Sequence, residues 1–266
     1  MRNANALAIY GIEKNTPIKM YEMGLVFFEV IGLSITAAAY YKYREDRSEE
    51  DLDLVDISLS DLKLALETGS ATSFRLYHES NNGVLWDASF GYSTKDFGGF
   101  YHIDAQGLVS TFNKERFLEF ASNFCTLGSM DYAIFYSADD VADALFYAAG
   151  ENFVRVYDYE DPDLFYMETG GVSEGAELYK KEKLRMTYSA NVINDAHLEL
   201  RVGACSLREW ISSEVSRGSL RQASSNLWFW TVDDRELGKV NNELGAHGVL
   251  ISWEPPKPPK KSRKIP

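Results

Sequence analysis

The spacing of apolar residues along this chain changes repeatedly between a helical period and a strand-like period. Apolar side chains three to four positions apart, bounded by capping residues and glycines, predict helices at 58–69, 113–128, 139–150, 206–214 and 233–248. Runs rich in aromatic and β-branched residues predict strands at 73–80, 84–93, 131–137, 152–160, 227–232 and 249–255. Helices and strands therefore alternate along most of the chain.

This alternation predicts an α+β fold, in which helices pack on one face of a mixed, largely antiparallel sheet. The dipeptide Asn82-Gly83 between two strand-like runs is typical of a tight hairpin. Residues 227–255 instead follow the order strand, helix, strand, which favours a parallel, right-handed βαβ unit. A division into two ferredoxin-like halves, 20–130 and 131–256, is compatible with this order, although no internal repeat supports it.

The longest apolar run, Met23–Tyr41, is long enough to cross a bilayer and is followed by basic residues. Glu29 lies inside the run, where a carboxylate would be costly in lipid. Ile31, Leu33 and Ile35 alternate with small residues, and this period of two is typical of a strand with one buried face. The run is therefore interpreted as a long core strand, with a membrane anchor as the alternative.

The two ends of the chain differ in composition from the rest. The first nineteen residues contain a weak apolar run that Glu13 and Lys14 end, so residues 1–19 are interpreted as a loose leader before the body. Residues 257–266 contain five basic residues, three prolines and no acid, which predicts a disordered basic tail. The folded α+β body is then expected to span 20–256.

The body is strongly acidic. The whole chain has a formal net charge of −13, and because the tail contributes +5, residues 1–256 carry −18. A body of this charge repels the phosphates of nucleic acids and attracts basic proteins. Two cysteines, Cys125 and Cys205, are too few for a disulfide framework, and this favours a reducing, cytoplasmic location.

The most acidic stretch is also rich in aromatic residues. Between residues 131 and 163 nine acids stand against one base, with eight aromatic residues among them. This combination is typical of a surface that binds a basic protein. The alternative is an ordinary sorting of faces, with the aromatic rings inside and the acids in water. The predicted partner-binding residues are Asp139, Asp140, Asp143, Tyr157, Asp158, Tyr159, Glu160, Asp161 and Asp163.

No familiar catalytic or metal-binding motif is present in the sequence. It has no Gly-rich phosphate loop, no nucleophile elbow and no zinc-binding His-Glu pattern. The acidic run at 158–163 lacks the spacing of a calcium loop, so no metal and no cofactor is expected. His197 near Asp195 is the one weak catalytic candidate. An enzyme with an unrecognised acidic site is therefore the alternative to a non-catalytic binding protein.

Two of the five tryptophans, Trp228 and Trp230, stand two positions apart in the segment "LWFWTV". In a strand they share one face, with Leu227 and Phe229 on the other. Apolar residues on both faces are typical of a strand that is covered on both sides. Both tryptophans are therefore predicted to be core residues rather than a recognition surface.

Two blocks in the last quarter of the chain, "LRMTYSANVINDAHL…LREWI" and "LWFWTVDDRELGKVNNELGAHGVLISW", resemble the end of bacterial proteins encoded beside secreted toxins, which are regarded as immunity proteins. The resemblance implies a compact, acidic, non-catalytic protein that blocks a cognate toxin by covering its active site. It assigns no functional residue. Together with the charge, it predicts a cytoplasmic immunity protein whose partner is a basic toxin, with no nucleic acid and no membrane involved.

Overall fold

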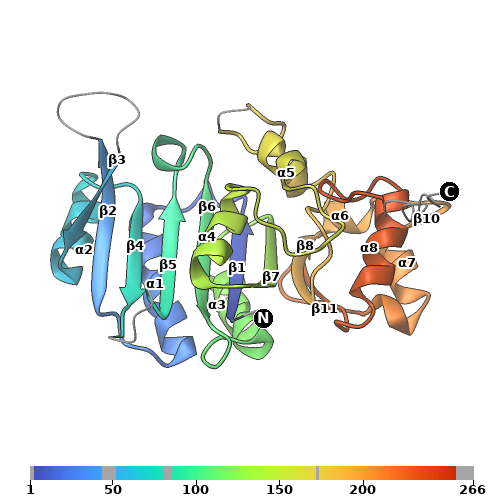
Figure 1. Cartoon of the computed structure of the whole chain (residues 1–266), viewed down its shortest axis with the longest axis horizontal. Coiled ribbons are helices and arrows are strands. Elements are labelled where there is room, and N and C mark those ends of the chain that lie inside the picture. The colour runs from blue at the N-terminus through green and yellow to red at the C-terminus, as the bar shows by residue number, and fades with distance from the viewer. Residues whose placement is uncertain (1–2, 44–51, 81–85, 172–173, 256–266) are drawn as a thin grey trace, which may run out of the picture.

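The computed structural model describes residues 3–43, 52–80, 86–171 and 174–255. Within that part of the chain, ten strands form one sheet in which every neighbouring pair is antiparallel. The strands of this sheet are β1 (Ala4–Tyr10), β2 (Ala37–Tyr43), β3 (Leu52–Ile57), β4 (Phe74–His78), β5 (Ala88–Ser93), β6 (His102–Leu108), β7 (Tyr132–Ala138), β8 (Ala190–Asn194), β11 (Ser219–Gln222) and β12 (Leu227–Thr231). Their order across the sheet is β11-β12-β8-β7-β1-β6-β5-β4-β2-β3 (Figure 1).

Helices connect these strands along the chain. The α-helices are α1 (Pro17–Ile31), α2 (Leu59–Thr68), α3 (Lys114–Leu127), α4 (Val141–Ala149), α5 (Pro162–Glu168), α6 (Asp195–Leu198), α7 (Leu207–Ser212) and α8 (Leu237–Ala246). Short 3₁₀ turns occur at Lys95–Phe97, Leu178–Lys180 and Val215–Arg217, and β9 (Arg201–Val202) pairs with β10 (Cys205–Ser206). The predicted α+β class and the antiparallel sheet are confirmed.

Two hydrophobic cores lie on opposite faces of the sheet. Helices α1, α2 and α3 cover one face, where their apolar residues belong to the same core as Leu7 and Ile9 of β1. On the opposite face α4 lies against β1, β6 and β7, and the C-terminal helices add to the same core. Figure 1 shows α4 in front of these strands and α1 behind the sheet. The predicted helix 113–128 places its aromatic stripe in the first core, as expected.

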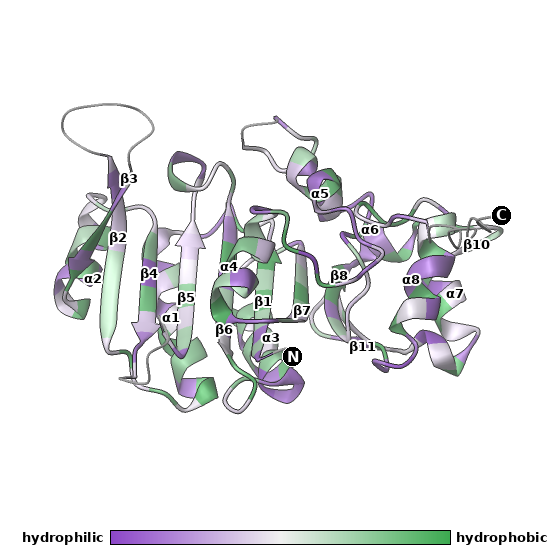
Figure 2. Ribbon diagram, viewed as in Figure 1, coloured by the Kyte–Doolittle hydropathy of each residue, from purple (hydrophilic) through white to green (hydrophobic). Residues whose placement is uncertain are grey.

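The interpretation of residues 1–19 as a loose leader is wrong. β1 pairs along its whole length with β6 on one side and β7 on the other, and of its seven residues only Asn5 is not fully buried. Figure 2 shows this strand in hydrophobic colours. Its alanines made the apolar signal weak, yet small side chains are what the close approach of α4 requires.

The interpretation of Met23–Tyr41 as one long strand is also wrong. Thr16 caps α1, Pro17 occupies its first turn, and Gly32 ends it in a left-handed conformation with φ of 74°. The period of two begins at the last residue of α1 and continues through the connection 32–36 to the first residue of β2. None of the helices in the described part of the chain combines the length and the apolarity that a bilayer crossing requires.

The expected βαβ unit at residues 227–255 does not form. β12 is antiparallel to both of its neighbours, and residues 249–255 make two isolated bridges instead of a strand. The apolar side chains of this segment are buried against the chain around Leu184. The predicted helix 233–248 is shorter than expected, since α8 begins at Leu237 without a side-chain cap from Asp233 or Asp234.

Strands of both expected halves, 20–130 and 131–256, belong to the same sheet. β7 pairs with β1, and β1 pairs with β6, so the sheet continues from one half into the other. The halves are therefore not separate ferredoxin-like sandwiches. The Asn82-Gly83 turn and the basic tail 257–266 lie outside the described residues, but β4 and β5 do pair as the hairpin requires.

The prediction for the tryptophan pair is confirmed in its main part. Trp230 is fully buried, and Trp228 is half-buried with its indole N–H donating to Asp195 at 2.8 Å. Leu227 and Phe229 enter the core on the other face of the sheet.

Candidate functional site

The segment between α4 and the end of α5, residues 150–168, forms what we call the acidic lobe. Gly150 ends α4 with φ of 77°, and the chain then follows an irregular path to Asp161, whose side chain caps α5. The expected strand at 152–160 is absent because Asn152 and Phe153 both have φ of 56°, which a strand cannot accommodate. In Figure 1 the lobe ends in α5, which projects above the sheet.

A buried ion pair holds the lobe on the core. Glu160 is 0% exposed and accepts hydrogen bonds from the Tyr147 hydroxyl at 2.6 Å and the Val156 amide at 3.2 Å. The Nε of Arg185 lies 3.7 Å from its carboxylate, and the guanidinium is packed between the rings of Tyr147 and Phe165. Burial raises the pKa of Glu160, although Arg185 acts in the opposite direction. The prediction that Glu160 contacts a partner is therefore wrong.

Most of the other predicted acids are available to solvent. Asp139, Asp140, Asp158 and Asp163 are exposed. Asp140 also has a structural role, because its carboxylate caps α4 by accepting hydrogen bonds from the amides of Ala142 and Asp143.

Two predicted acids are partly enclosed. Asp161 is half-buried and has the same capping role at α5 as Asp140 has at α4. Asp143 is also half-buried, and burial together with the neighbouring acids Asp140 and Asp139 raises the pKa of its carboxyl.

The lobe also exposes large apolar side chains that the sequence analysis did not select. Phe153 is 72% exposed, and α5 adds Met167 at 62% and Leu164 at 39%. A cavity of about 360 Å³ is lined by Gly150, Glu151, Asn152, Phe153, Asp163 and Tyr166. Phe153 falls within the predicted strand 152–160 but is not among the predicted partner-binding residues, since no local pattern distinguishes it from its neighbours. Its exposure depends on the left-handed backbone at Asn152 and Phe153.

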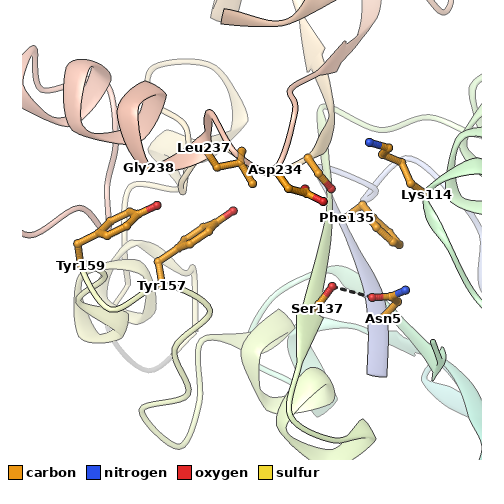
Figure 3. Close-up of a pocket in the computed structure, with 10 residues that line it drawn as sticks. Asn5, Lys114, Phe135, Ser137, Tyr157, Tyr159, Asp234, Leu237 and Gly238 are labelled. Carbon is orange, nitrogen blue, oxygen red and sulfur yellow. Dashed lines mark hydrogen bonds between the residues drawn. The ribbon is translucent and has the colours of Figure 1, made fainter. Parts of the chain in front are cut away.

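The predicted tyrosines face a second cavity, which we call the slot. Its volume is about 570 Å³ and its lining residues are Asn5, Lys114, Phe135, Ser137, Tyr157, Tyr159, Ser189, Asp234, Leu237 and Gly238. Tyr157 and Tyr159 are half-buried and stack in parallel, with ring centroids 5.2 Å apart (Figure 3). The Tyr157 hydroxyl donates to the carbonyl of Thr187 at 2.9 Å. The stacked rings therefore form one firm wall of the slot.

The slot lies where two neighbouring strands separate. β7 pairs with β1 along its whole length, but with β8 only at Ala133–Phe135. Beyond Phe135 the chain that leads into β8 no longer pairs with β7. The carbonyl of Ser189, which directly precedes β8, accepts a hydrogen bond from the amide of Val232 instead. On the β8 side, Tyr136–Ala138 thus lack a strand partner within the described residues. Asp139 and Asp140 follow directly at the end of this edge.

A polar cluster occupies the sheet face beside α4. Arg75 and Asp104 are buried and form a bidentate pair with two bonds of 2.7 Å. Burial alone would raise the pKa of the Asp104 carboxyl, but the Arg75 guanidinium outweighs it and holds that pKa below its usual value. Burial also lowers the pKa of His102. These groups and Glu151 line a cavity of about 270 Å³.

The catalytic candidate His197 is a structural residue. It is fully buried, and its ring and backbone complete a capping box with Asn194 at the start of α6. Burial lowers its pKa to about 4, so the ring is neutral at pH 7. Asp195 interacts instead with Trp228 and Arg208.

No disulfide joins Cys125 to Cys205, since both are free. Within the described ranges, no group of three or more His, Cys, Asp or Glu side chains is arranged to hold a metal ion.

Comparison with known proteins relates this architecture to one solved fold. Neither a family model nor a curated protein sequence matches the chain. The Pseudomonas aeruginosa T6SS protein PA0821 is similar in structure, with a TM-score of 0.52 over 94% of this chain and 78% of that one, at 10% identity. At this identity the similarity shows a common fold and does not by itself show a common function.

A second structural neighbour is a chain from the complex of the toxic C-terminal tip of CdiA from Pseudomonas aeruginosa with its immune protein. The structural match covers 52% of this chain and 87% of the neighbour, at 9% sequence identity. The TM-score of 0.26 is too low to carry an argument about fold or function.

Proposed function

We propose that this chain is a non-catalytic immunity protein, which neutralises a basic bacterial toxin by binding it through the acidic lobe. The observation that carries the proposal is the exposure of Phe153 among acids. A large aromatic ring at 72% exposure is typical of a binding anchor when charged residues surround it. The resemblance of the last quarter of the chain to immunity proteins supports the same role.

In the proposed complex, the charged and the apolar residues of the lobe have different roles. Exposed carboxylates such as Asp158 and Asp163 would steer a basic partner toward the lobe and raise the association rate. Phe153, Leu164 and Met167 would then lose water on contact and slow dissociation. Covering a toxin's active site requires only such a surface and no chemical step. We place this encounter in the cytoplasm, where the two free cysteines stay reduced.

The proposal is tested with the toxin candidate encoded beside this gene, by toxin-protection and surface-binding measurements. Phe153→Ala is expected to raise Kd about tenfold to a hundredfold, chiefly through faster dissociation. The matched control is Val215→Ala, because Val215 is 95% exposed but lies far along the chain from the lobe. A Phe153→Ala chain that protects cells and binds as the parent does would contradict the proposal.

The charge component needs variants that preserve the helix caps. Asp140→Ser and Asp161→Ser remove a charge but retain an oxygen that can cap α4 or α5. Combined with Asp158→Asn and Asp163→Asn, they are expected to lower the association rate about tenfold at low salt and to weaken its salt dependence. An association rate that is unchanged in both respects would place recognition on another face.

The polar cavity beside α4 favours a second candidate function, that of an enzyme. Glu151 lies at this cavity with a raised pKa, caused by burial and by the charge of Asp104, and His102, whose pKa is lowered by burial, lies nearby. Groups with shifted pKa values in one cavity are a general feature of acid–base sites. Turnover of a substrate that is lost in Glu151→Gln, with toxin protection absent, would favour this function.

A further inference from the structure

We infer that the slot is a docking site for an extended segment of the partner protein, which adds a strand to the open edge of β7. The inference rests on the proposed function, since it names the part of the partner that is bound. The segment carries a basic side chain over the stacked rings of Tyr157 and Tyr159. It thus joins the acidic lobe and the sheet into one recognition surface.

The open edge of β7 is the first observation. Pairing between β7 and β8 stops at Phe135 and Ala190, while β7 continues to Ala138. Backbone N–H and C=O groups at the edge of a sheet are satisfied well by another extended chain. A partner segment that runs along Tyr136–Ala138 would pair with β7 beyond the point where its pairing with β8 ends. The main chain of this segment would form the backbone hydrogen bonds to β7.

Gly238 is the second and independent observation. It lies in the first turn of α8, and glycine is a poorer helix former than alanine. A Cβ placed on Gly238 would meet no atom within 4 Å, and the residue has no positive φ that would demand glycine. Neither packing nor backbone conformation therefore explains the missing side chain. Gly238 lines the slot, and a larger residue there would fill it.

The walls of the slot indicate the chemistry of the segment. Tyr157 and Tyr159 stack with their rings parallel, so the outer face of this stack is an aromatic surface over which a lysine or arginine side chain can lie (Figure 3). Asp234 lies across from them, and Asp139 follows the end of β7. Lys114 is the one basic residue of the lining and contributes the opposite charge. The lining itself carries one acid and one base, and the exposed Asp139 at the end of β7 is the additional acid that favours a basic occupant.

The inference is tested on the isolated full-length chain with three short peptides. The probe is acetyl-Thr-Lys-Thr-Lys-Thr-amide, and amide chemical shifts of Tyr136, Ser137 and Ala138 are followed by NMR. Replacing both lysines by glutamate tests the charge. Replacing the central threonine by proline keeps the charge but removes a backbone donor and strand pairing.

The lysine peptide is expected to bind in about the millimolar range, with saturable shifts at these three residues. The glutamate and proline peptides are each expected to bind about three to ten times more weakly, since each loses about one stabilising interaction. Absence of shifts at the β7 edge, or equal binding of the proline peptide, would overturn the inference.

A graded series at Gly238 gives a second test. Gly238→Ala is expected to leave peptide binding within about twofold, because a methyl group occupies little of the slot. Gly238→Leu is expected to weaken binding at least about tenfold while the far-UV circular dichroism stays unchanged. Should the leucine variant fold poorly, Asp234→Asn replaces it and is expected to weaken the lysine peptide about threefold.

The inference would be overturned if the lysine peptide bound equally well to the parent chain, to Gly238→Leu and to Asp234→Asn. The two proposals fail independently. A chain that binds the peptide in the slot but gives no protection against the toxin keeps the docking site and loses the immunity role. A chain that protects cells but leaves the β7 edge unperturbed keeps the immunity role and loses the docking site.

Discussion

Phe153 and Glu160 lie seven residues apart in the acidic lobe, and their environments are the reverse of what their side chains favour. The aromatic ring is exposed, whereas the carboxylate is fully buried. Burial of Glu160 is tolerable because Arg185, Tyr147 and the Val156 amide surround its oxygens. Exposure of Phe153 has no such local compensation. Glu160 is therefore a structural residue of the lobe, whereas the exposed Phe153 is the residue on which the proposed function depends.

The buried pair can be tested at the level of one atom. Glu160→Gln keeps the shape of the side chain but leaves the Arg185 charge without its counterion in the core. Removing one partner of a buried pair is expected to lower the free energy of unfolding by about 3–5 kcal/mol, as measured by urea denaturation. Asp158→Asn, at an exposed acid two residues away, is expected to change it by less than about 0.5 kcal/mol. Equal effects of the two variants would contradict the structural role of Glu160.

At the level of elements, local signals predicted those helices whose capping residues and apolar stripe agree. Ser58 caps α2, Asn113 caps α3 and Ser206 forms the capping box of α7, each at the start of a helix that the sequence predicts. Two of the errors fall on segments whose partners lie far away in the chain. β1 was read as a leader because its alanines gave little apolar signal. Residues 249–255 were read as a strand, although they pack against the chain near Leu184.

The central place of β1 leads to a truncation experiment. A chain that starts at Met20 lacks β1 and leaves β6 and β7 without their shared partner. The buried side chains of Leu7, Ile9 and Tyr10 alone contribute about 5–9 kcal/mol, which approaches the whole stability of a typical domain. We expect this truncated chain to show no cooperative thermal unfolding by circular dichroism.

A chain that starts at Asn3 keeps β1 complete and serves as the control. It is expected to unfold with the parent midpoint. Cooperative unfolding of the chain from Met20 would show that β1 is dispensable, contrary to its place between β6 and β7.

At the level of the whole molecule, one sheet with a core on each face contains strands from both the N-terminal and the C-terminal parts of the chain. The strands nearest its middle, β7, β1 and β6, come from residues 4–10, 102–108 and 132–138. The lobe and the slot both lie on this middle region, so their geometry depends on the complete sheet. The architecture resembles that of PA0821, whose sequence is 10% identical.

The continuity of the sheet predicts a single unfolding transition. Four of the five tryptophans lie between residues 210 and 253, so tryptophan fluorescence reports mainly on the C-terminal part of the chain. Far-UV circular dichroism reports on the whole. We expect the two signals to change at the same urea concentration, because the ten-stranded sheet contains strands from both halves. A fluorescence transition that is separated from the dichroism transition would show two independently stable halves.

The sequence by itself determined the α+β class, most of the helices with their caps, the hairpin of β4 and β5, the acidic balance and the covered faces of β12. These features depend on spacing between near neighbours, composition or the period of a strand, all of which act within one segment. The limits of α1 and the exposure of Phe153 depend instead on local features, namely the Thr16 cap, the Gly32 stop and the left-handed backbone at 152–153, which the sequence pattern did not reveal. Tertiary structure alone decided that β1 is central and that Glu160 is buried. The slot likewise exists only because β8 departs from β7. In each of these cases the deciding contact joins residues far apart in the chain, and local periodicity carries no information about such contacts.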